Sequence, residues 1–465
     1  MLDYLGHPQH LSQGCSRRAI LRLGGLSPLG LSLSQLLASS PPPDISRGGS
    51  FGKAKRCLLI YLWGGPSHLD LFDLKSDAPS EVRGPFRPIR TSVPGIQIGE
   101  VLPNLAKQMH RIGLIRSVSH SDNNHSTSAH WMLTGHKHPL AAENFGARRT
   151  DFPHLGSVIT RYSPAKQDLP TFVALPERIG TTAGFVTPGQ DGGFLGGKYD
   201  PFRIEGKPNE DDFSVKDLQP VPGLTRDRLT NRKNLLDEFD RFRRHLDESP
   251  EYADQEAFRQ RAFELVTSPR VREAFDLGAE SLSMRESYDM RPFGQSLLMA
   301  RRLLESGVKL VTVYWHRDQP GVDTTWDTHS NNFNGLRDRL APQVDRPIST
   351  LLEDLAARGL LDDTLVVWSS EFGRTPKVNK NAGRDHWGKC NSLWMAGAGV
   401  PGGQAYGASD KIGSEPVTDA VSPGDFAATI YHLLGLDPHR TMITDRLNRS
   451  FPIADGRVLN RFLGA

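Results

Sequence analysis

The sequence predicts an α/β protein with a mostly parallel sheet that is covered by helices on both faces. Short apolar runs rich in β-branched and aromatic residues alternate with longer segments of helical periodicity, as in parallel sheets with crossover helices. Polar clusters follow the apolar runs, and open α/β sheets bind ligands at the carboxyl ends of their strands. At 465 residues the chain is long enough for one large domain or for two.

The apolar runs are predicted as buried strands because they are short and almost continuously apolar. They are residues 57–63, 112–118, 308–315, 364–369 and 392–396. Helices are predicted where apolar residues recur at helical spacing, with a capping serine and a first-turn proline (Ser422, Pro423) at the start of the last one and Gly435 at its end. The other predicted helices are 102–110, 125–133, 292–306 and 333–358.

Two segments are predicted to lie outside this alternation. The charged segment 224–279 carries an apolar stripe without a lasting heptad, so it is predicted as part of a helical insertion at about 224–290 that packs against the sheet. The Gly-rich segment 180–206 is predicted as a surface loop, and a lid is one function for it.

The N-terminus resembles a twin-arginine export signal. Arg17 and Arg18 precede a weakly apolar segment, 23–38, and a Ser/Pro-rich exit. We therefore predict a signal and linker over residues 1–45, one domain over 46–465, and a periplasmic or extracellular location reached through the twin-arginine translocase. The alternative is a basic amphipathic helix. No other stretch approaches 18 apolar residues, so no stable membrane span is expected in the mature form.

Charge and cysteine usage exclude several classes of protein. The chain has 56 Lys and Arg against 53 Asp and Glu, so its global field indicates no nucleic-acid partner. The cysteines, Cys15, Cys57 and Cys390, lack the CxxC spacing of a zinc knuckle. Two buried thiols at positions 57 and 390 are favoured over a disulfide between them.

Histidines and acidic residues gather just past the ends of the predicted strands. Because these ends meet at one edge of a parallel sheet, the clusters are expected to converge there. Mixed imidazole and carboxylate ligands suit Zn²⁺ or Mn²⁺, whereas Mg²⁺ or Ca²⁺ favour oxygen ligands, so a pair of divalent ions of undetermined identity is predicted. The candidate ligands are His68, Asp70, His125, Asp327, His329, Glu371, Asp385 and His386, with His316 and Asp323 nearby.

Candidate catalytic residues accompany these ligands. Ser126 stands at a predicted helix N-terminus, where unpaired amides and the helix dipole stabilise an anionic ester or an alkoxide, and Thr127 is the alternative nucleophile. The competing interpretation is that Ser126 only caps the helix. Arg374 is predicted to bind a substrate oxyanion with two hydrogen bonds, and a surface salt bridge is its alternative.

Several long motifs resemble the domain-of-unknown-function 1501 family over nearly the whole mature chain. They are the paired arginines 17–18 and the segments 57–73, 124–135, 326–329, 371–376 and 383–387. The family is similar in fold to alkaline phosphatases, sulfatases and cofactor-independent phosphoglycerate mutases. The resemblance therefore implies an alkaline phosphatase-like three-layer sandwich with a two-metal site.

The same resemblance implies roles for individual residues. Glu371 falls where the superfamily has a metal-binding Asp-His pair, and His386 falls where a late metal-binding histidine precedes a strand. Asp327 and His329 resemble the Asp and His ligands of the other metal, and Ser126 lies near the nucleophile position.

The chain also departs from the superfamily pattern. Gly64 and Gly65 replace the Asp after the first strand, which leaves His68 or Asp70 to serve, and Phe372 stands where a His is usual. No Cys-x-Pro-x-Arg segment of a formylglycine sulfatase is present.

These expectations lead to two hypotheses of function. The first is an exported metal-dependent hydrolase that acts on the phosphate or sulfate ester of a small molecule or polysaccharide. The second is a non-catalytic envelope or polysaccharide-binding protein in which tryptophans near the site stack on sugars. Those tryptophans are Trp63, Trp131, Trp315, Trp326 and Trp387.

Overall fold

The computed structural model describes most of the chain beyond residue 48, and Gly49–Ala465 forms one compact unit. The predicted export signal, most of the predicted helical insertion, and both His316 and Asp323 lie outside the described residues. The described residues are 49–140, 142, 145–165, 169–181, 183–210, 213, 228, 231, 268–315 and 325–464.

An eight-stranded sheet in the order β12-β4-β11-β8-β1-β7-β5-β6 forms the centre of the unit. Strand β11 pairs antiparallel with both of its neighbours, and every other pairing in the sheet is parallel. The mostly parallel sheet that the sequence predicts is therefore confirmed. Its strands are β12 (Gln404–Tyr406), β4 (Ile112–Val118), β11 (Asn391–Ala396), β8 (Thr364–Ser369), β1 (Arg56–Tyr61), β7 (Leu310–Tyr314), β5 (Phe172–Leu175) and β6 (Phe202–Arg203).

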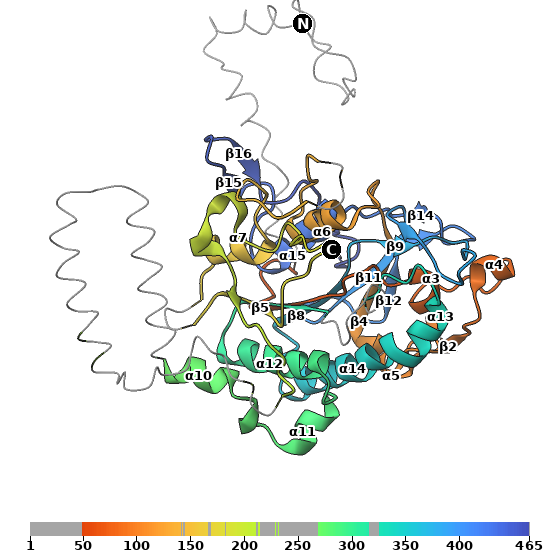
Figure 1. The fold of residues 1–465 in the computed structure, drawn as a ribbon, viewed down its shortest axis with the longest axis horizontal. Helices are drawn as coiled ribbons and strands as arrows, with labels where there is room; N and C mark the ends of the chain where they lie inside the picture. Colours follow the sequence, from red (N-terminus) through yellow and green to blue (C-terminus); the bar gives the residue numbers. More distant parts are fainter. Residues whose placement is uncertain are drawn as a thin grey trace, which may run out of the picture. The chain divides into compact units, whose positions relative to one another are not determined.

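Helices cover both faces of this sheet, which makes three layers (Figure 1). On one face α12 (Pro292–Ser306) packs on β1 and β7, α14 (Pro342–Ala357) packs on α12, and α5 (Pro103–Gln108) packs on α14. On the other face α7 (Leu155–Tyr162) contacts β5 and β7, and α15 (Pro423–Leu433) packs on α6 (His125–Thr134). The predicted sandwich is confirmed, since strands β1, β7 and β8 are buried in its middle layer.

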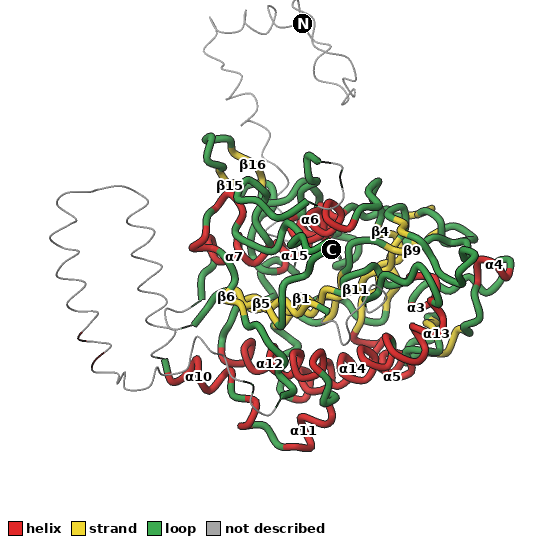
Figure 2. Tube along the Cα trace, in the orientation of Figure 1, coloured by secondary structure: helices red, strands yellow, loops and turns green. Residues whose placement is uncertain are grey.

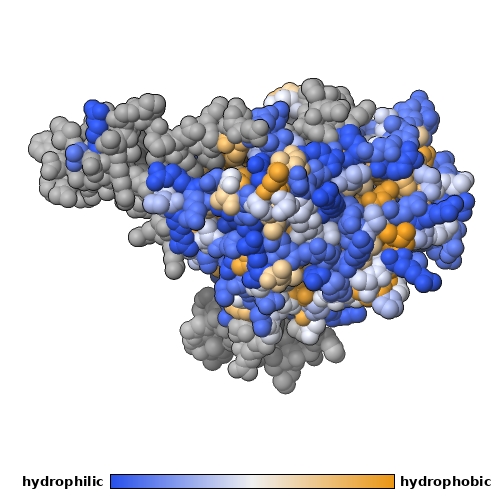
Figure 3. Space-filling model, turned by 90° about the horizontal axis from the view of Figure 1, so that it is seen from below, coloured by the Kyte–Doolittle hydropathy of each residue, from blue (hydrophilic) through white to orange (hydrophobic). Residues whose placement is uncertain are grey.

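The two layers of helices differ in their loops. Figure 2 shows many loops and turns on the side of α6, α7 and α15, whereas long helices fill the opposite layer. The outer face of that helical layer is mainly hydrophilic, with small scattered hydrophobic areas (Figure 3). Shorter elements complete the unit: α3 (His68–Leu71), α4 (Ser80–Arg83), α10 (Pro269–Phe275), α11 (Leu282–Ser287), α13 (Asn332–Gly335), and the strand pairs β2 (Pro88–Arg90) with β3 (Gln97–Gly99), β13 (Ala408–Ser409) with β14 (Pro416–Thr418), and β15 (Met442–Thr444) with β16 (Ser450–Pro452).

Proline explains the main difference between predicted and observed helices. The predicted helix 333–358 is divided into α13, a π-helical turn at Leu336–Leu340, and α14. Pro342 stands in the first turn of α14 and has no N–H to donate to the preceding turn, so the regular bonding pattern changes there. The predicted start of α15 is confirmed, because the Ser422 side chain accepts from the Asp425 N–H and Pro423 occupies the first turn.

One antiparallel strand brings the candidate site together. The parallel strands β1, β4, β7 and β8 end at one edge of the sheet, and β11 begins there because it runs the other way. The loop before β11 contains β10 (His386–Trp387), which pairs with β9 (Gly373–Arg374) in the loop after β8. The loop that carries His386 therefore meets the loops that follow the parallel strands.

Two further predictions concern thiols and membranes. Cys57 and Cys390 are buried free thiols, as predicted, and burial raises the pKa of each well above its usual value. Among the residues that the structure describes, no helix combines the length and apolar character needed to cross a bilayer.

Candidate metal centre

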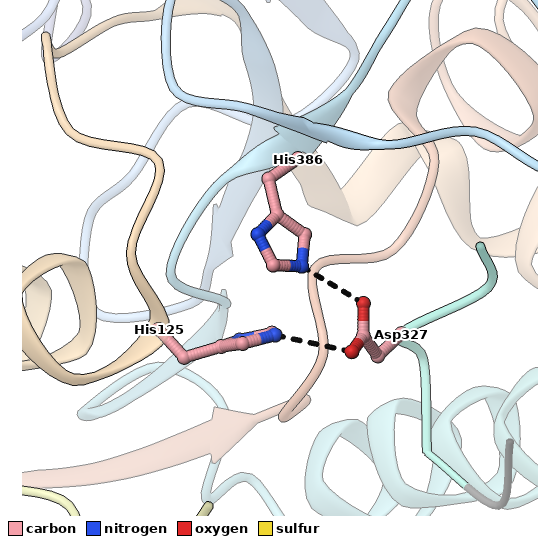
Figure 4. Close-up of side chains that lie close together, drawn as sticks. All are labelled: His125, Asp327 and His386. Carbon is pink, nitrogen blue, oxygen red and sulfur yellow. Dashed lines mark hydrogen bonds and ion pairs between the residues drawn. The ribbon is translucent and has the colours of Figure 1, made fainter. Parts of the chain in front are cut away.

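Three ligand-type side chains from separate loops converge at this edge of the sheet. One ligand atom each of His125, Asp327 and His386 lies within 4.8 Å of the other two. His125 Nε2 is 3.2 Å from Asp327 Oδ2, and His386 Nε2 is 3.0 Å from Asp327 Oδ1 (Figure 4). Within the described ranges no other group of three His, Cys, Asp or Glu residues meets this criterion.

Hydrogen bonds on the far side of each imidazole aim its Nε2 at Asp327. His125 Nδ1 lies 2.7 Å from Glu371 Oε1, and His386 Nδ1 lies 2.9 Å from the Asn123 carbonyl oxygen. Both oxygens accept, so each Nδ1 carries a proton, and Nε2 is the ligand atom once the ring is neutral. Partners of this kind orient metal-binding histidines in proteins.

His329 and Asp385 extend the cluster toward solvent. His329 Nε2 is 3.0 Å from Asp327 Oδ1 and 2.9 Å from His386 Nε2, while its Nδ1 is 2.7 Å from Asp385 Oδ1. Hydrogen bonding to Asp327 raises the pKa of His329. His329 is thus placed as a flanking cation or as a further ligand, with Asp385 as the group that orients it.

The charges within the cluster fit a bound cation. Burial lowers the pKa of His386, and the charges of His125 and Arg374 add to the effect despite the hydrogen bond to Asp327. Burial also opposes ionisation of Asp327, but hydrogen bonds from His125, His329 and His386 hold its pKa well below the usual range. These hydrogen bonds hold the imidazole nitrogens next to an ionised carboxylate, and a divalent cation could take the place of the shared protons.

Glycine at position 64 allows the loops to approach one another. Gly64 has φ +115, and a Cβ there would lie 2.3 Å from the Asp327 backbone nitrogen. Its N–H donates to Glu371 Oε1 at 2.7 Å, which is the same oxygen that contacts His125. A glycine at this position thus allows the Asp327 loop and Glu371 to come together.

Arg374 links the loops that carry Gly64, Asp327 and Arg384. Its side chain is buried and donates to the carbonyls of Gly65, Arg384, Gly64 and Trp326 and to Asp327 Oδ1 at 2.7 Å. The structure therefore gives Arg374 a different role from the predicted contact with a substrate oxyanion, since its nitrogens are engaged by the protein.

His68 and Asp70 are not brought into the cluster. His68 is buried with Nε2 2.9 Å from the Gly413 carbonyl and Nδ1 3.4 Å from the Arg374 N–H. Asp70 accepts from Arg384, Ser67 and Asn332 and is fully buried. The structure corrects the prediction for both residues, because their polar atoms already bind protein partners. The buried Arg384 was missed, since nothing in the sequence marks it as the partner of Asp70.

Ser126 and Thr127 follow His125 in the first turn of α6. The helix begins after Asn124, so Ser126 is not the capping residue. Both side chains are buried, and neither hydroxyl has a hydrogen-bond partner in the described part of the chain. A buried hydroxyl without a partner is costly, so these two are candidates for contact with a ligand.

The tryptophans near the centre fall into two groups. Trp63, Trp315 and Trp326 are buried, and the Trp63 ring packs against the His125 imidazole with centroids 4.9 Å apart. Trp131 and Trp387 are partly exposed, each below a lysine ammonium. Trp63, Trp315 and Trp326 therefore expose too little ring surface to stack on a sugar as predicted, although Trp63 and Trp315 also line a cavity.

Solved structures that align with the chain share little sequence identity with it. The lipoteichoic acid synthase LtaP from Listeria monocytogenes is 11% identical with TM-score 0.36 and covers 83% of this chain and 74% of its own. The PsFucS1 sulfatase from Pseudoalteromonas sp. is 12% identical with TM-score 0.37 and covers 85% and 72%. A protein in the alkaline phosphatase superfamily from Vibrio parahaemolyticus is 11% identical with TM-score 0.37 and covers 88% and 71%.

A search of curated proteins finds no match to the sequence. A family model does match it over residues 54–463, which is nearly the whole unit described above. That model carries the description "Protein of unknown function (DUF1501)". The chain therefore belongs to the DUF1501 family, as its motifs predict.

Proposed function

We propose that this protein is a metal-dependent hydrolase that acts on a phosphate or sulfate ester. The observation that carries the proposal is the convergence of His125, Asp327 and His386 within 4.8 Å, with an oriented imidazole nitrogen facing an ionised carboxylate. These residues come from the start of α6 and from the loops after β7 and before β11. Such a site at the carboxyl edge of a parallel sheet is where α/β enzymes place their chemistry.

His125, Asp327 and His386 would hold the ion, and His329 would flank it. Two imidazoles and one carboxylate favour Zn²⁺ or Mn²⁺ over Mg²⁺ or Ca²⁺. A divalent cation held there supplies Lewis-acid stabilisation of charge on the ester oxygens. The described residues form one such group, so we propose one ion at this site and leave the predicted second ion as an expectation.

Ser126 is the proposed nucleophile, with Thr127 as the alternative. Their hydroxyls are buried without a hydrogen-bond partner in the described part of the chain, directly after His125. The first N–H groups of a helix lack partners within the helix and carry the positive end of its dipole. The start of α6 would therefore stabilise both the anionic ester and a deprotonated hydroxyl.

Metal content and ester hydrolysis test this function together. The purified protein should carry stoichiometric Zn or Mn by elemental analysis after growth with each metal, and should cleave 4-nitrophenyl phosphate or 4-nitrophenyl sulfate. His386→Ala should lose both the metal and the activity. His439→Ala is the matched control, because His439 is exposed and lies in the turn after α15.

The proposal would be overturned if the purified protein contained no bound metal after growth with each of the two metals. A metal-loaded protein that cleaves neither ester would support a metal site without hydrolase activity and would favour the non-catalytic alternative. Ser126→Ala and Thr127→Ala distinguish the nucleophiles, since only the true one should abolish turnover while metal content stays constant.

We also propose that the protein is exported through the twin-arginine translocase to the periplasm or beyond. The support is the sequence around Arg17 and Arg18, which lies outside the described residues. Replacing both arginines by lysine should retain the protein in the cytoplasm in a fractionation experiment. Unchanged export of that variant would contradict the proposal.

A further inference from the structure

A cavity of about 250 Å³ lies beside the metal centre. Trp63 follows β1, Trp315 follows β7, and the lining residues among 177–181 and 184–186 follow β5; these three parallel strands are neighbours in the sheet. The cavity therefore opens at the same edge as the centre. Trp63 joins the two, because this residue lines the cavity and its ring packs against His125 at a centroid distance of 4.9 Å.

The walls of this cavity combine apolar and charged side chains. Trp63 and Trp315, which are only 4% and 2% exposed, and the buried Ile179 lie on its inner side. Glu177 and Arg178 stand in the same lining. Sites for small organic ligands are mostly apolar with a small number of polar groups that fix the orientation of the ligand. A ring with one apolar face and several hydroxyl groups matches this lining.

The loop that forms the outer wall is held in a defined shape. Gly180 and Val186 form an antiparallel bridge, and the Thr181 N–H donates to the Phe185 carbonyl at 2.9 Å. At its base the buried Gln190 side chain accepts from the Ile179 N–H at 3.0 Å and donates to the Ile179 carbonyl at 2.8 Å. The wall is thus preformed, which reduces the entropy that a ligand must overcome on binding.

Charged contacts tie the same loop to the sheet. Asp191 accepts from Arg178 at 3.3 Å and from Arg203 in the edge strand β6 at 2.7 Å. Arg178 is therefore held near the cavity by a fixed carboxylate, while part of its side chain stays exposed. The first residues of the segment 180–206, which the sequence predicts as a surface loop or lid, belong to this wall. The start of that segment therefore lies near the metal centre.

We propose that this cavity binds one sugar ring, the alcohol part of a saccharide ester whose phosphate or sulfate group lies at the metal centre. The proposal rests on the function proposed above and names its substrate class. At about 250 Å³ the cavity is smaller than the roughly 300–1,000 Å³ typical of pockets for drug-sized ligands, so it suits a single ring rather than an oligosaccharide. The C–H groups of the sugar would contact the apolar side chains of the wall, with hydroxyl groups at Glu177 and Arg178.

This assignment is tested with pairs of esters that have the same acid group and different alcohols. The wild-type protein should have a higher kcat/KM for glucose 6-phosphate or glucose 6-sulfate than for the matching methyl ester. Val186→Trp, which fills the half-buried wall of the cavity, should lower this ratio about tenfold, in the range of discrimination that pocket contacts provide. Val417→Trp, at a position 61% exposed in the distant strand β14, should leave the ratio unchanged.

Phe185→Ala provides a second variant in case Val186→Trp does not fold. Phe185 is 42% exposed, so its removal should not disturb the core and should lower the same ratio. An unchanged ratio in both variants, or a wild-type protein that does not distinguish the two alcohols, would overturn the proposal. A preference for phenyl esters over sugar esters would also overturn it and would assign the cavity to aromatic alcohols.

Binding without hydrolysis separates this inference from the proposed function. Calorimetric titration with methyl glycosides of glucose, galactose, mannose and fucose should detect binding of at least one to the wild-type protein and not to Val186→Trp. Sugar binding without ester cleavage would refute the hydrolase and keep the sugar site. Ester cleavage with no sugar bound by any probe would refute the sugar site and keep the hydrolase.

Discussion

Asp70 and Asp327 are both acidic residues past the end of a strand and both bind an arginine, but the rest of their surroundings differ. Asp70 is fully buried against the Arg384 guanidinium, which donates to both of its oxygens, and Ser67 and Asn332 complete its hydrogen bonds. Asp327 has a side chain 18% exposed; its Oδ1 accepts from Arg374, and both of its oxygens also face imidazole nitrogens. The partners of Asp70 do not titrate near neutral pH, whereas the imidazoles around Asp327 form a site where a proton and a metal ion compete.

The largest effect should come from breaking the buried pair. Asp70→Ala leaves the fully buried Arg384 without its counter-ion, so we expect a loss of about 3–5 kcal/mol in the free energy of unfolding. Chemical denaturation measures it. Asp338→Ala removes an exposed partner of Arg337 and should cause no measurable change. Equal stability of the two variants would show that the buried ion pair between Asp70 and Arg384 does not stabilise the fold.

The second effect concerns metal rather than stability. Asp327→Asn removes the carboxylate that faces both His125 and His386, and we expect metal affinity to fall by more than about a hundredfold, beyond the effect typical of outer-sphere residues. Arg374 keeps its backbone carbonyl partners, so the variant should still fold. Competition with a fluorescent chelator provides the affinity. Undiminished affinity would place the metal elsewhere.

A smaller effect is expected for Glu371, which touches the proposed ligand but not the ion. Glu371→Gln keeps an acceptor for the Gly64 N–H but weakens the bond that holds His125 in its tautomer. We expect metal affinity to fall about 10- to 100-fold, as for other residues that orient a ligating histidine. Thermal unfolding with and without metal should show a smaller stabilisation by metal than in the wild type. An affinity equal to that of the wild type would assign Glu371 to loop packing alone.

The smallest and most gradual effect is the dependence of stability and metal affinity on pH. Burial lowers the pKa of His125, but hydrogen bonds to Asp327 and Glu371 outweigh it and raise the value to about 9. In the metal-free protein the charged ring stabilises the fold fully below pH 6.5, and this contribution disappears as the pH rises toward 9. Metal must displace the same proton, so metal affinity should increase over that interval and binding should release protons. A pH-independent affinity would contradict this coupling.

The sequence predicts most of the fold because its strongest signals are long. The bounds predicted for β4, β8 and α12 match the structure, since each is a clear apolar run or a helix bounded by proline and glycine. Strands β5, β6 and β12 were not predicted, because they have only 4, 2 and 3 residues and their pairing partners are distant in sequence. Runs of that length carry no usable periodicity.

The sequence predicts most of the residues of the candidate site but not which of them contact one another. The structure brings His125, Asp327, His329, Glu371, Asp385 and His386 together, and it places His68 and Asp70 in separate buried contacts. Sequence alone cannot tell which carboxylate is fully enclosed by protein partners, because Arg384, which binds Asp70, is 314 residues away along the chain. The close approach of Gly64 to Asp327 is likewise a consequence of tertiary packing.

Anomalous X-ray diffraction from crystals grown with Zn²⁺ or Mn²⁺ tests the central claim most directly. We predict one strong anomalous peak in contact with His125 Nε2, His386 Nε2 and an oxygen of Asp327. A peak at another set of residues, or no peak under saturating metal, would contradict the proposed centre and the hydrolase that depends on it.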